Sequence, residues 1–288
     1  MKIGLVIPTL NAGHELGASL DAIMAQTKMP DDILVIDSAS DDDTLSVASS
    51  YPGVRTMVIR REDFDHGGTR QLALEEVSGD FVLFLTQDAV PADGRYIENL
   101  LHPFEDPKVA MVSGRQLPKR DARRYVQLVQ EFNYPAESNL RAEADIRKLG
   151  IKALFVSDAC SAYRRSALDV IGGIPRPCMT NEDMLAAARF LRHGFKVAYE
   201  AEARVIHSHS LSLVEQYRRN RLVGSFLAKY SNELSIPSEV GEGFTLAKSV
   251  ALRLLSEKRL AEAALFGIDC AARVIGNRVG RCLVAGGE

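Results

Sequence analysis

Carboxylates stand at the ends of apolar runs or at the start of a helical pattern in this sequence. Asp37 closes the run ILVID, Asp88 follows FVLFL in the stretch FLTQDAVP, and Glu182 and Asp183 open NEDMLAAARFLRHG. Carboxylate oxygens are preferred ligands of hard divalent cations. A carboxylate beside a substrate hydroxyl can also act as a general base. These residues therefore indicate metal binding or proton transfer at a common site.

Each carboxylate also has a purely structural interpretation. Asp88 can cap the end of its strand, and acids in the first turn of a helix, such as Glu182 and Asp183, are favoured by the helix dipole. For Asp41 to Asp43, which follow the second strand in DSASDDDT, we favour helix capping. Asp37 differs because it ends an apolar strand, where its carboxylate could accept the N3–H of a pyrimidine base.

Two further motifs carry groups that could bind ligands. In VIHSHS, His207 and His209 lie on one side of an extended segment, and imidazole is a common metal ligand. In FDHGGTR, two glycines and a threonine precede a helix with Arg70 in its first turn. Free backbone N–H groups and Arg70 suit a diphosphate or the edge of a base. The structural alternatives are a satisfied polar histidine and a capped turn.

The elements that must position these residues alternate between strands and helices. Apolar runs such as KIGLVIPT, DILVIDSAS and DFVLFLTQDA alternate with helical patterns such as ELGASLDAIMAQ and GTRQLALEEV. The continuous apolar runs predict strands covered on both faces. We therefore expect an α/β fold with a mostly parallel sheet, in which ligands bind beyond the carboxyl ends of the strands. After about residue 211 the pattern is helical to the end.

Composition narrows the classes of function. The chain has 288 residues, of which 46% are hydrophobic, and a formal net charge of −3. This charge gives no general attraction to nucleic acid or to anionic lipid, so we expect no nucleic-acid partner. The four cysteines are widely separated and form no disulfide framework, which favours a reducing, cytosolic setting. The apolar run at the N-terminus is too short to span a membrane.

The order of the motifs is more specific than any one of them. IPTLNAG, VIDSASDDDT, DFDHGGTRQLAL, FLTQDAVP, NEDMLAAARFLRHGFKVAY and ARVIHSHS follow one another within about residues 1–210. This series resembles the inverting family 2 glycosyltransferases of the GT-A fold. FDHGGTR and TQDA are most similar to bacterial rhamnosyltransferases that use dTDP-L-rhamnose to build O-antigen and other cell-surface polysaccharides.

The resemblance implies roles for individual residues. Asp183 matches the catalytic base, with Glu182 beside it shaping the acceptor pocket. Asp88 matches the aspartate that binds Mg²⁺ or Mn²⁺, and His207 matches a histidine that reaches the metal or diphosphate. Thr9 and Asp37 would contact the base and ribose, with Arg70 supporting that end of the site. The full nucleotide-sugar site implied in this way comprises Pro8, Thr9, Asn11, Asp37, Ser38, Gly68, Arg70, Gln87 and Asp88.

One position departs from the family pattern. Thr86 stands where the first aspartate of the family's Asp-x-Asp motif is usual, and a threonine can donate a hydrogen bond but carries no charge. The intact Glu182-Asp183 pair still implies single displacement at the anomeric carbon with inversion. The alternatives are a transferase of the same fold that uses UDP-GlcNAc or a UDP-hexose, and an inactive subunit that binds a nucleotide sugar.

The resemblance also predicts the division of the chain. Residues 1–210 would form the GT-A catalytic domain, with nucleotide-sugar binding in about 1–120 and the acceptor side in about 121–210. Residues 211–288 would form a helical extension, where Tyr217, Arg218, Arg219 and Arg221 make a basic cluster. This extension could be a helical cap, a homodimer contact or a peripheral attachment to the inner face of the cell membrane, near a saccharide or lipid-linked acceptor. The expected location is the cytoplasm in each case.

Overall fold

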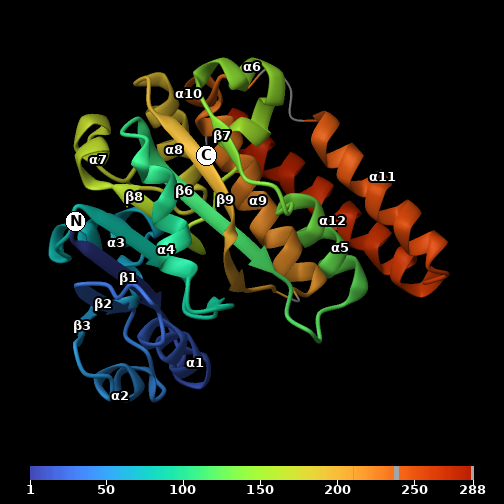
Figure 1. Ribbon diagram of the computed structural model, residues 1–288. Helices are drawn as coiled ribbons and strands as arrows, with labels where there is room; N and C mark the ends of the chain where they lie inside the picture. The colour runs from blue at the N-terminus through green and yellow to red at the C-terminus, as the bar shows by residue number, and fades with distance from the viewer. Residues whose placement is uncertain (210, 237–239, 287–288) are drawn as a thin grey trace. The chain divides into compact units, whose positions relative to one another are not determined.

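The computed structural model describes residues 1–209, 211–236 and 240–286 (Figure 1). Its strands are β1 (Ile3–Thr9), β2 (Asp32–Asp37), β3 (Val54–Val58), β4 (Phe81–Leu85), β5 (Val90–Pro91), β6 (Val109–Leu117), β7 (Asn139–Arg141), β8 (Cys160–Arg164) and β9 (Lys196–Ile206). Its α-helices are α1 (Gly13–Met24), α2 (Thr44–Ser49), α3 (His66–Glu76), α4 (Tyr96–Leu101), α5 (Arg124–Asn133), α6 (Ile146–Leu149), α7 (Arg165–Ile171), α8 (Glu182–Arg192), α9 (Leu213–Lys229), α10 (Ser231–Leu234), α11 (Val240–Ser256) and α12 (Leu260–Ala285).

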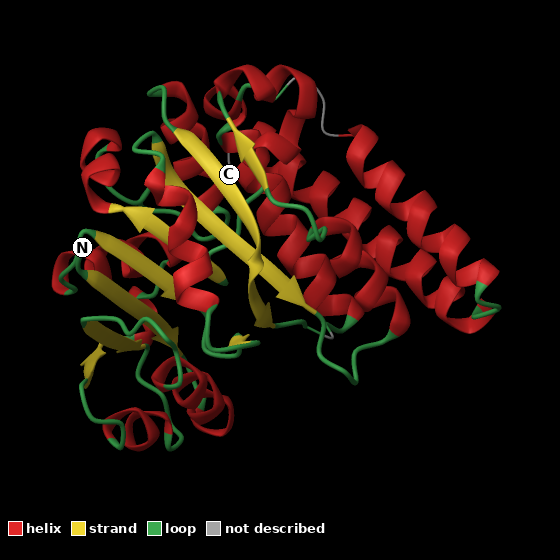
Figure 2. Ribbon diagram, in the orientation of Figure 1, coloured by secondary structure: helices red, strands yellow, loops and turns green. Residues whose placement is uncertain are grey.

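The strands form one mixed sheet in the order β3-β2-β1-β4-β8-β6-β9-β5, with β7 on β9 (Figure 2). β3, β2, β1 and β4 pair in parallel. β8 pairs antiparallel with β4 and β6, and β9 pairs antiparallel with β5 and β7. The α/β class is confirmed, and the first four strands form a parallel part of the sheet. β8 inserts beside β4 in the opposite direction, which a pattern of apolar runs cannot reveal because it carries no strand direction.

Both faces of the parallel strands are buried, as their continuous apolar runs predicted. Ile3, Leu5 and Ile7 of β1 pack in one cluster with residues of α1 and α4. The alternate residue Val6 is fully buried as well, although it points to the other face. Figure 2 shows helices on both sides of the yellow strands. The sheet is thus fixed from both faces, and its strand ends are held at defined positions.

The strand directions bring four connections to one edge of the sheet. β1, β2 and β4 end there, and the antiparallel β8 begins there, because Leu85 at the end of β4 pairs with Cys160 at the start of β8. Residues just before β8 therefore lie at the same edge as residues just after β4. Asp158 is placed at this edge although it precedes a strand instead of following one.

The chain forms two compact units that do not follow the sequence order. The first consists of residues 1–116, 135–145 and 154–207, and it holds the sheet. The second consists of residues 117–134, 146–153 and 208–288. Segments 117–134 and 146–153, which we expected beside the acceptor in the catalytic domain, thus belong to the unit of C-terminal helices. That unit has its own apolar cluster, formed by Tyr125, Leu128, Val250, Leu254 and Phe266 from α5, α11 and α12.

Helices α9 and α12 of the second unit approach each other through glycines. A side chain on Gly280 would overlap the carbonyl oxygen of Arg221, and one on Gly224 would overlap the carbonyl oxygen of Asn277. The two backbones are therefore in direct contact, which a larger residue would prevent. Among the helices in the described ranges, none is long and apolar enough to cross a membrane.

This contact predicts opposite effects for two substitutions in α12. Gly280→Ala should lower the free energy of unfolding by about 1–3 kcal/mol, since the added methyl group overpacks the helix contact. Gly267→Ala is the matched control, because no described atom lies within 4 Å of a Cβ at this position. It should raise stability by about 0.5–1 kcal/mol, the helix-propensity gain of alanine over glycine. Urea denaturation followed by circular dichroism measures both; equal effects of the two substitutions would contradict the glycine contact.

Candidate active site

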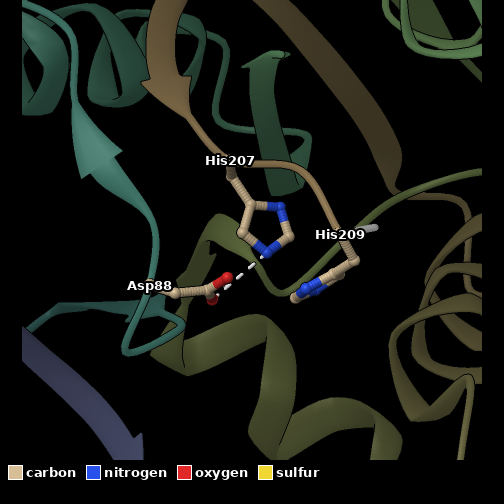
Figure 3. Close-up of side chains that lie close together, drawn as sticks. All are labelled: Asp88, His207 and His209. Carbon is tan, nitrogen blue, oxygen red and sulfur yellow. Dashed lines mark ion pairs between the residues drawn. The ribbon is translucent and has the colours of Figure 1, made fainter. Parts of the chain in front are cut away.

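Asp88, His207 and His209 form a group of metal-ligating side chains. Asp88 follows β4 and His207 follows β9, and Figure 3 shows both side chains directed toward each other. The Nε2 atom of His207 lies 3.3 Å from Oδ1 of Asp88. With the exposed His209, the ligand atoms of all three residues lie within 4.8 Å of one another. The structure thus contains a possible Asp-His-His metal site.

The other ring nitrogen of His207 shows why this group fits a cation. Nδ1 of His207 lies 2.8 Å from Oε1 of Gln116, which accepts hydrogen bonds only, so Nδ1 carries the proton. In the neutral ring Nε2 is then a lone-pair donor that faces the carboxylate of Asp88. Two such groups at 3.3 Å repel each other unless a proton or a cation lies between them. A histidine oriented by a hydrogen bond from its second nitrogen is the usual arrangement of a metal ligand.

Thr86 lies in the same connection, two residues before Asp88. Its backbone N–H donates to the carbonyl of Ala159, which ties the connection to β8. Its hydroxyl is buried and has no hydrogen-bond partner within the part of the chain that the structure describes. A buried, unsatisfied hydroxyl is costly, so this side chain is suited to a partner supplied by a ligand.

The connections after β1 and β2 are joined around Asp37. Its carboxylate accepts hydrogen bonds from the Thr9 hydroxyl (2.9 Å), the Ser40 hydroxyl (2.6 Å) and the Ser40 N–H (2.8 Å). Asp37 has no exposed surface, and Ser38 is buried, with its N–H donating to the carbonyl of Thr9. Pro8 lies in β1 opposite Ile36. In this arrangement Asp37 holds two connections together, and a base would reach its carboxylate only by replacing one of these donors.

Asn11 and Gln87 fix the same region through the backbone. The N–H of Asn11 donates to the Ser40 hydroxyl at 2.8 Å, and the Asn11 side chain accepts the N–H of Asp41 at 2.9 Å. Gln87 accepts the N–H of Leu10 at 2.8 Å and donates to its carbonyl at 3.3 Å. Both predicted donor-site residues therefore lie at the carboxyl edge of the sheet, where they order the backbone around it.

The backbone N–H groups of the Gly-rich motif FDHGGTR, which we expected to be free for a ligand, have partners within the protein. The N–H of Gly68 donates to the carboxylate of Asp65, which caps α3, and the N–H of Gly67 donates to the carbonyl of Cys178. Two N–H groups that we expected to face a diphosphate are thus occupied within the protein. A side chain at Gly67 would overlap the carbonyl of Pro175, so glycine is required there by the close approach of the two segments.

Arg70 lies in a buried cluster of carboxylates. Only 4% of its surface is exposed, its Nε is 3.2 Å from Oδ2 of Asp158, and its NH1 is 3.0 Å from Oε1 of Glu182. The backbone N–H of Asp158 donates to Oδ2 of Asp183 at 3.1 Å. Arg70 therefore pairs with Glu182 at the start of α8 and with Asp158, although we expected it at the nucleotide end of the site.

Asp158 connects the members of this cluster. Besides its contacts to Arg70 and Asp183, its carboxylate accepts hydrogen bonds from the hydroxyls of Ser161 (2.6 Å) and Tyr163 (2.8 Å). Asp158 is 3% exposed and Glu182 is 4% exposed, whereas Asp183 is partly exposed. Of these three acids, Asp183 is thus the one that an external molecule can reach.

The cluster holds more negative than positive charge. Burial raises the pKa of Asp183 well above its ordinary value, and the neighbouring charges of Glu182 and Asp158 raise it further. Burial also raises the pKa of Glu182 to about 7, although Arg70 opposes this effect. Both directions follow from three carboxylates that share a single guanidinium in a region of low dielectric constant. Asp183 is therefore a stronger base than a solvent-exposed aspartate.

Sequence reasoning missed two members of the site and left a third out of the metal set. Asp158 was overlooked because we looked for acids after strands, whereas it precedes the antiparallel β8. Gln116, which orients His207, is an uncharged residue near the end of β6 and carries no sequence signal. His209 was noted for its spacing from His207, and the structure adds it to Asp88 and His207.

The fold agrees with comparisons to known proteins. Residues 5–172 match the model of glycosyl transferase family 2, which is more than half of the chain. The chain belongs to this family and is a glycosyltransferase. The O-antigen chain rhamnosyltransferase RfbN of Salmonella typhimurium is 44% identical over 251 residues, which cover 86% of this chain and 80% of the relative. The O-antigen chain rhamnosyltransferase WbaN of Salmonella anatum is 40% identical over 248 residues, which cover 85% and 78%.

Solved structures share the fold at low identity. The mannosyltransferase PcManGT from Pyrobaculum calidifontis, in complex with GDP-Man and Mn²⁺, has a TM-score of 0.64 and 17% identity, and the match covers 98% of this chain and 86% of that one. Residues 1–349 of TarS from S. aureus, in complex with UDP-GlcNAc, have a TM-score of 0.57 and 15% identity, with 100% and 93% covered. The GT-A fold is thereby confirmed.

The Asp-His-His group predicts a measurable cation affinity. Asp88→Asn and His207→Ala should each weaken Mn²⁺ binding by about tenfold or more, because each removes one ligand. Titration of the protein with Mn²⁺, followed by electron paramagnetic resonance of the free ion, gives the affinity. His102→Ala is the matched control, since the His102 side chain is 71% exposed and does not belong to the Asp-His-His group. Equal Mn²⁺ affinity of His207→Ala and His102→Ala would exclude His207 as a ligand.

Proposed function

We propose that this chain transfers L-rhamnose from dTDP-L-rhamnose to a hydroxyl of a saccharide or lipid-linked acceptor, with inversion, in the biosynthesis of a cell-surface polysaccharide. The observation that carries the choice of sugar is the 44% identity to RfbN across 86% of the chain. The chemistry itself is supported by the geometry of the first unit. That unit provides a partly exposed carboxylate in an acidic, buried setting, and its Asp88 and His207 form a separate pair suited to a cation.

Asp183 is the proposed base. It accepts the proton of the acceptor hydroxyl as the oxygen of that hydroxyl forms a bond to the anomeric carbon. The bond between the anomeric carbon and the diphosphate oxygen breaks in the same step, so the diphosphate leaves from the opposite face. A single displacement of this kind inverts the configuration and requires no nucleophile from the protein. Burial and the neighbouring charges raise the pKa of Asp183, which makes it a stronger proton acceptor than an ordinary aspartate.

Asp158 and Arg70 are proposed to position this base, and Glu182 to maintain its charge environment. The N–H of Asp158 holds one oxygen of Asp183, while Arg70 links Asp158 to Glu182. Glu182 is buried against Arg70, so its contribution to the acceptor pocket is indirect. The orientation of Asp183 is thus fixed by a network that does not itself need to contact the acceptor.

Asp88, His207 and His209 would hold the metal ion, for which we propose Mg²⁺ or Mn²⁺. When bound, the ion offsets the negative charge that gathers on the departing nucleoside diphosphate. The carboxylate and imidazole donors fit a divalent cation, and Gln116 fixes the ring of His207. The unsatisfied hydroxyl of Thr86 is a further group that could donate to the diphosphate or ribose, in place of the aspartate usual at this position.

The nucleotide is proposed to bind at the carboxyl edge of β1, β2 and β4. Thr9, Asp37 and Ser38 lie at that edge, and Asn11 and Gln87 order the backbone beside it. We propose that a pyrimidine base displaces Ser40 from Asp37 when it binds. Arg70 and Gly68 are engaged inside the protein and would support the site without direct contact to the donor.

Isothermal titration with dTDP, UDP and GDP, each with and without Mn²⁺, tests the proposal. Metal-dependent binding of dTDP in preference to the other two nucleotides supports rhamnosyl transfer. A preference for UDP keeps the mechanism and replaces the donor with a UDP-sugar. Failure of all three to bind would overturn the proposed function.

Loss of the base should abolish turnover without abolishing donor binding. Asp183→Asn should reduce kcat by about 10²–10⁴-fold, the usual contribution of general-base catalysis. The affinity for dTDP should stay within about threefold, because Asp183 does not belong to the proposed nucleotide site. A variant that keeps full kcat would remove Asp183 from the mechanism, and loss of dTDP binding would indicate a structural effect instead.

The charges around Asp183 predict the pH dependence. Because the base must be deprotonated, kcat/KM should fall as pH decreases through a pKa that lies above that of an ordinary aspartate. Asp158→Asn removes one of the charges that raise the pKa of Asp183. The fall of kcat/KM on the acid side of the pH profile, its acid limb, should therefore move to lower pH. Asp169→Asn, on α7 outside the cluster, is the control that should leave the limb in place. An acid limb that Asp158→Asn leaves unmoved would contradict this electrostatic coupling.

A further inference from the structure

The two units carry opposite charge. Counted from the sequence, the helical unit has 18 Lys and Arg residues against 10 Asp and Glu residues, a net charge of +8. The remainder has 17 basic and 28 acidic residues, a net charge of −11, so the two units account for the total of −3. The small net charge of the whole chain thus conceals a strongly basic unit. Such asymmetry is typical of a protein that binds an anionic surface with one part.

The carboxylates of the long helices in this unit are engaged within the protein. Glu257 pairs with Arg124, Glu262 with Arg259 and Asp269 with Arg273. Glu242 pairs with Lys152, and Glu215 accepts the capping bonds of Ser212. Lys248 of α11, Arg278 of α12 and Lys258 in the turn between these two helices are exposed. The outward charge of α9, α11 and α12 is therefore dominated by cations.

The outer face of α12 is apolar over most of its length. Exposed positions recur at intervals of three or four residues at Ala261, Ala264, Ile268, Ala271 and Ile275, and the series continues with Arg278. Glu262, Asp269 and Arg273 lie on the opposite side of the helix. An uncharged stripe of this length on the surface of a protein normally contacts another apolar surface.

Helix α11 exposes a second apolar stripe that includes a cation. Phe244, Leu252 and Leu255 are each at least half exposed, and Lys248 lies between them at helical spacing. Leu260, which is 68% exposed, follows the turn between α11 and α12. Large apolar side chains combined with lysine and arginine are the composition of helices that lie in the interface of a bilayer.

We propose that α11 and α12 form a docking surface for an anionic phospholipid bilayer, on which the helices lie without crossing it. A second copy of the chain is the less favourable occupant, because two such units packed face to face would bring two charges of +8 together. An anionic bilayer offers both an apolar layer for Ile268 and Ile275 and negative headgroups for Lys248 and Arg278. The inference concerns the helical unit and does not depend on the proposed donor or mechanism.

Co-sedimentation with vesicles tests the surface. The full chain should bind vesicles that contain phosphatidylcholine and phosphatidylglycerol, and binding should weaken as the salt concentration rises. It should bind vesicles of pure phosphatidylcholine at least about tenfold more weakly. Ile268→Gln/Ile275→Gln should weaken binding to the mixed vesicles by about tenfold or more, since both side chains leave the apolar layer.

Two further variants separate the contributions of charged and apolar side chains to vesicle binding. Lys248→Gln/Arg278→Gln should lower the salt dependence of binding, while Val58→Gln/Val170→Gln, at exposed apolar positions of the other unit, should bind as the parent does. Binding to mixed vesicles that the Ile268→Gln/Ile275→Gln variant retains in full would overturn the proposal. A second result would also overturn the proposal. In it, the parent chain does not bind vesicles but forms a dimer in sedimentation equilibrium, and the Ile268→Gln/Ile275→Gln variant is monomeric.

Discussion

The rest of the site depends on the burial of more negative than positive charge around Arg70. Asp158, Glu182 and Asp183 share this single guanidinium in the interior, and the hydroxyls of Ser161 and Tyr163 stabilise Asp158 further. Removal of Arg70 would leave carboxylates buried without a counterion, which is among the most costly changes in a protein interior. Burial, together with the neighbouring charges of Glu182 and Asp158, raises the pKa of Asp183, so the same cluster that is costly to bury also provides the base.

This cluster exists because the sheet is mixed. A fully parallel sheet would bring only the ends of strands to the ligand edge, whereas the antiparallel β8 brings its beginning there. Asp158 thereby reaches Asp183 at the start of α8 and Arg70 in the first turns of α3. Segments more than a hundred residues apart supply one electrostatic unit, and the continuous core on both faces of the sheet keeps their spacing fixed.

Charge is also distributed unevenly between the two units of the molecule. The unit with the sheet is strongly acidic, and the helical unit is strongly basic. A net negative charge on this unit disfavours the approach of free anionic substrates, which a bound cation would offset. The basic unit has no comparable cluster of buried acids among the residues described, and its carboxylates serve mainly to pair with arginines and to cap helices.

The sequence by itself determined the α/β class, the strands and helices of the first half, and the metal-ligand candidates Asp88 and His207. These depend on local patterns, because apolar runs mark buried strands and a residue after such a run falls at the ligand edge. Only the tertiary structure decided the partners of Arg70 and Gly68, the place of Asp158, and the burial of Asp37. It also decided which segments join the basic helical unit, since that unit is discontinuous in sequence. Strand direction and long-range pairing arise from packing of the whole chain, and no local pattern encodes them.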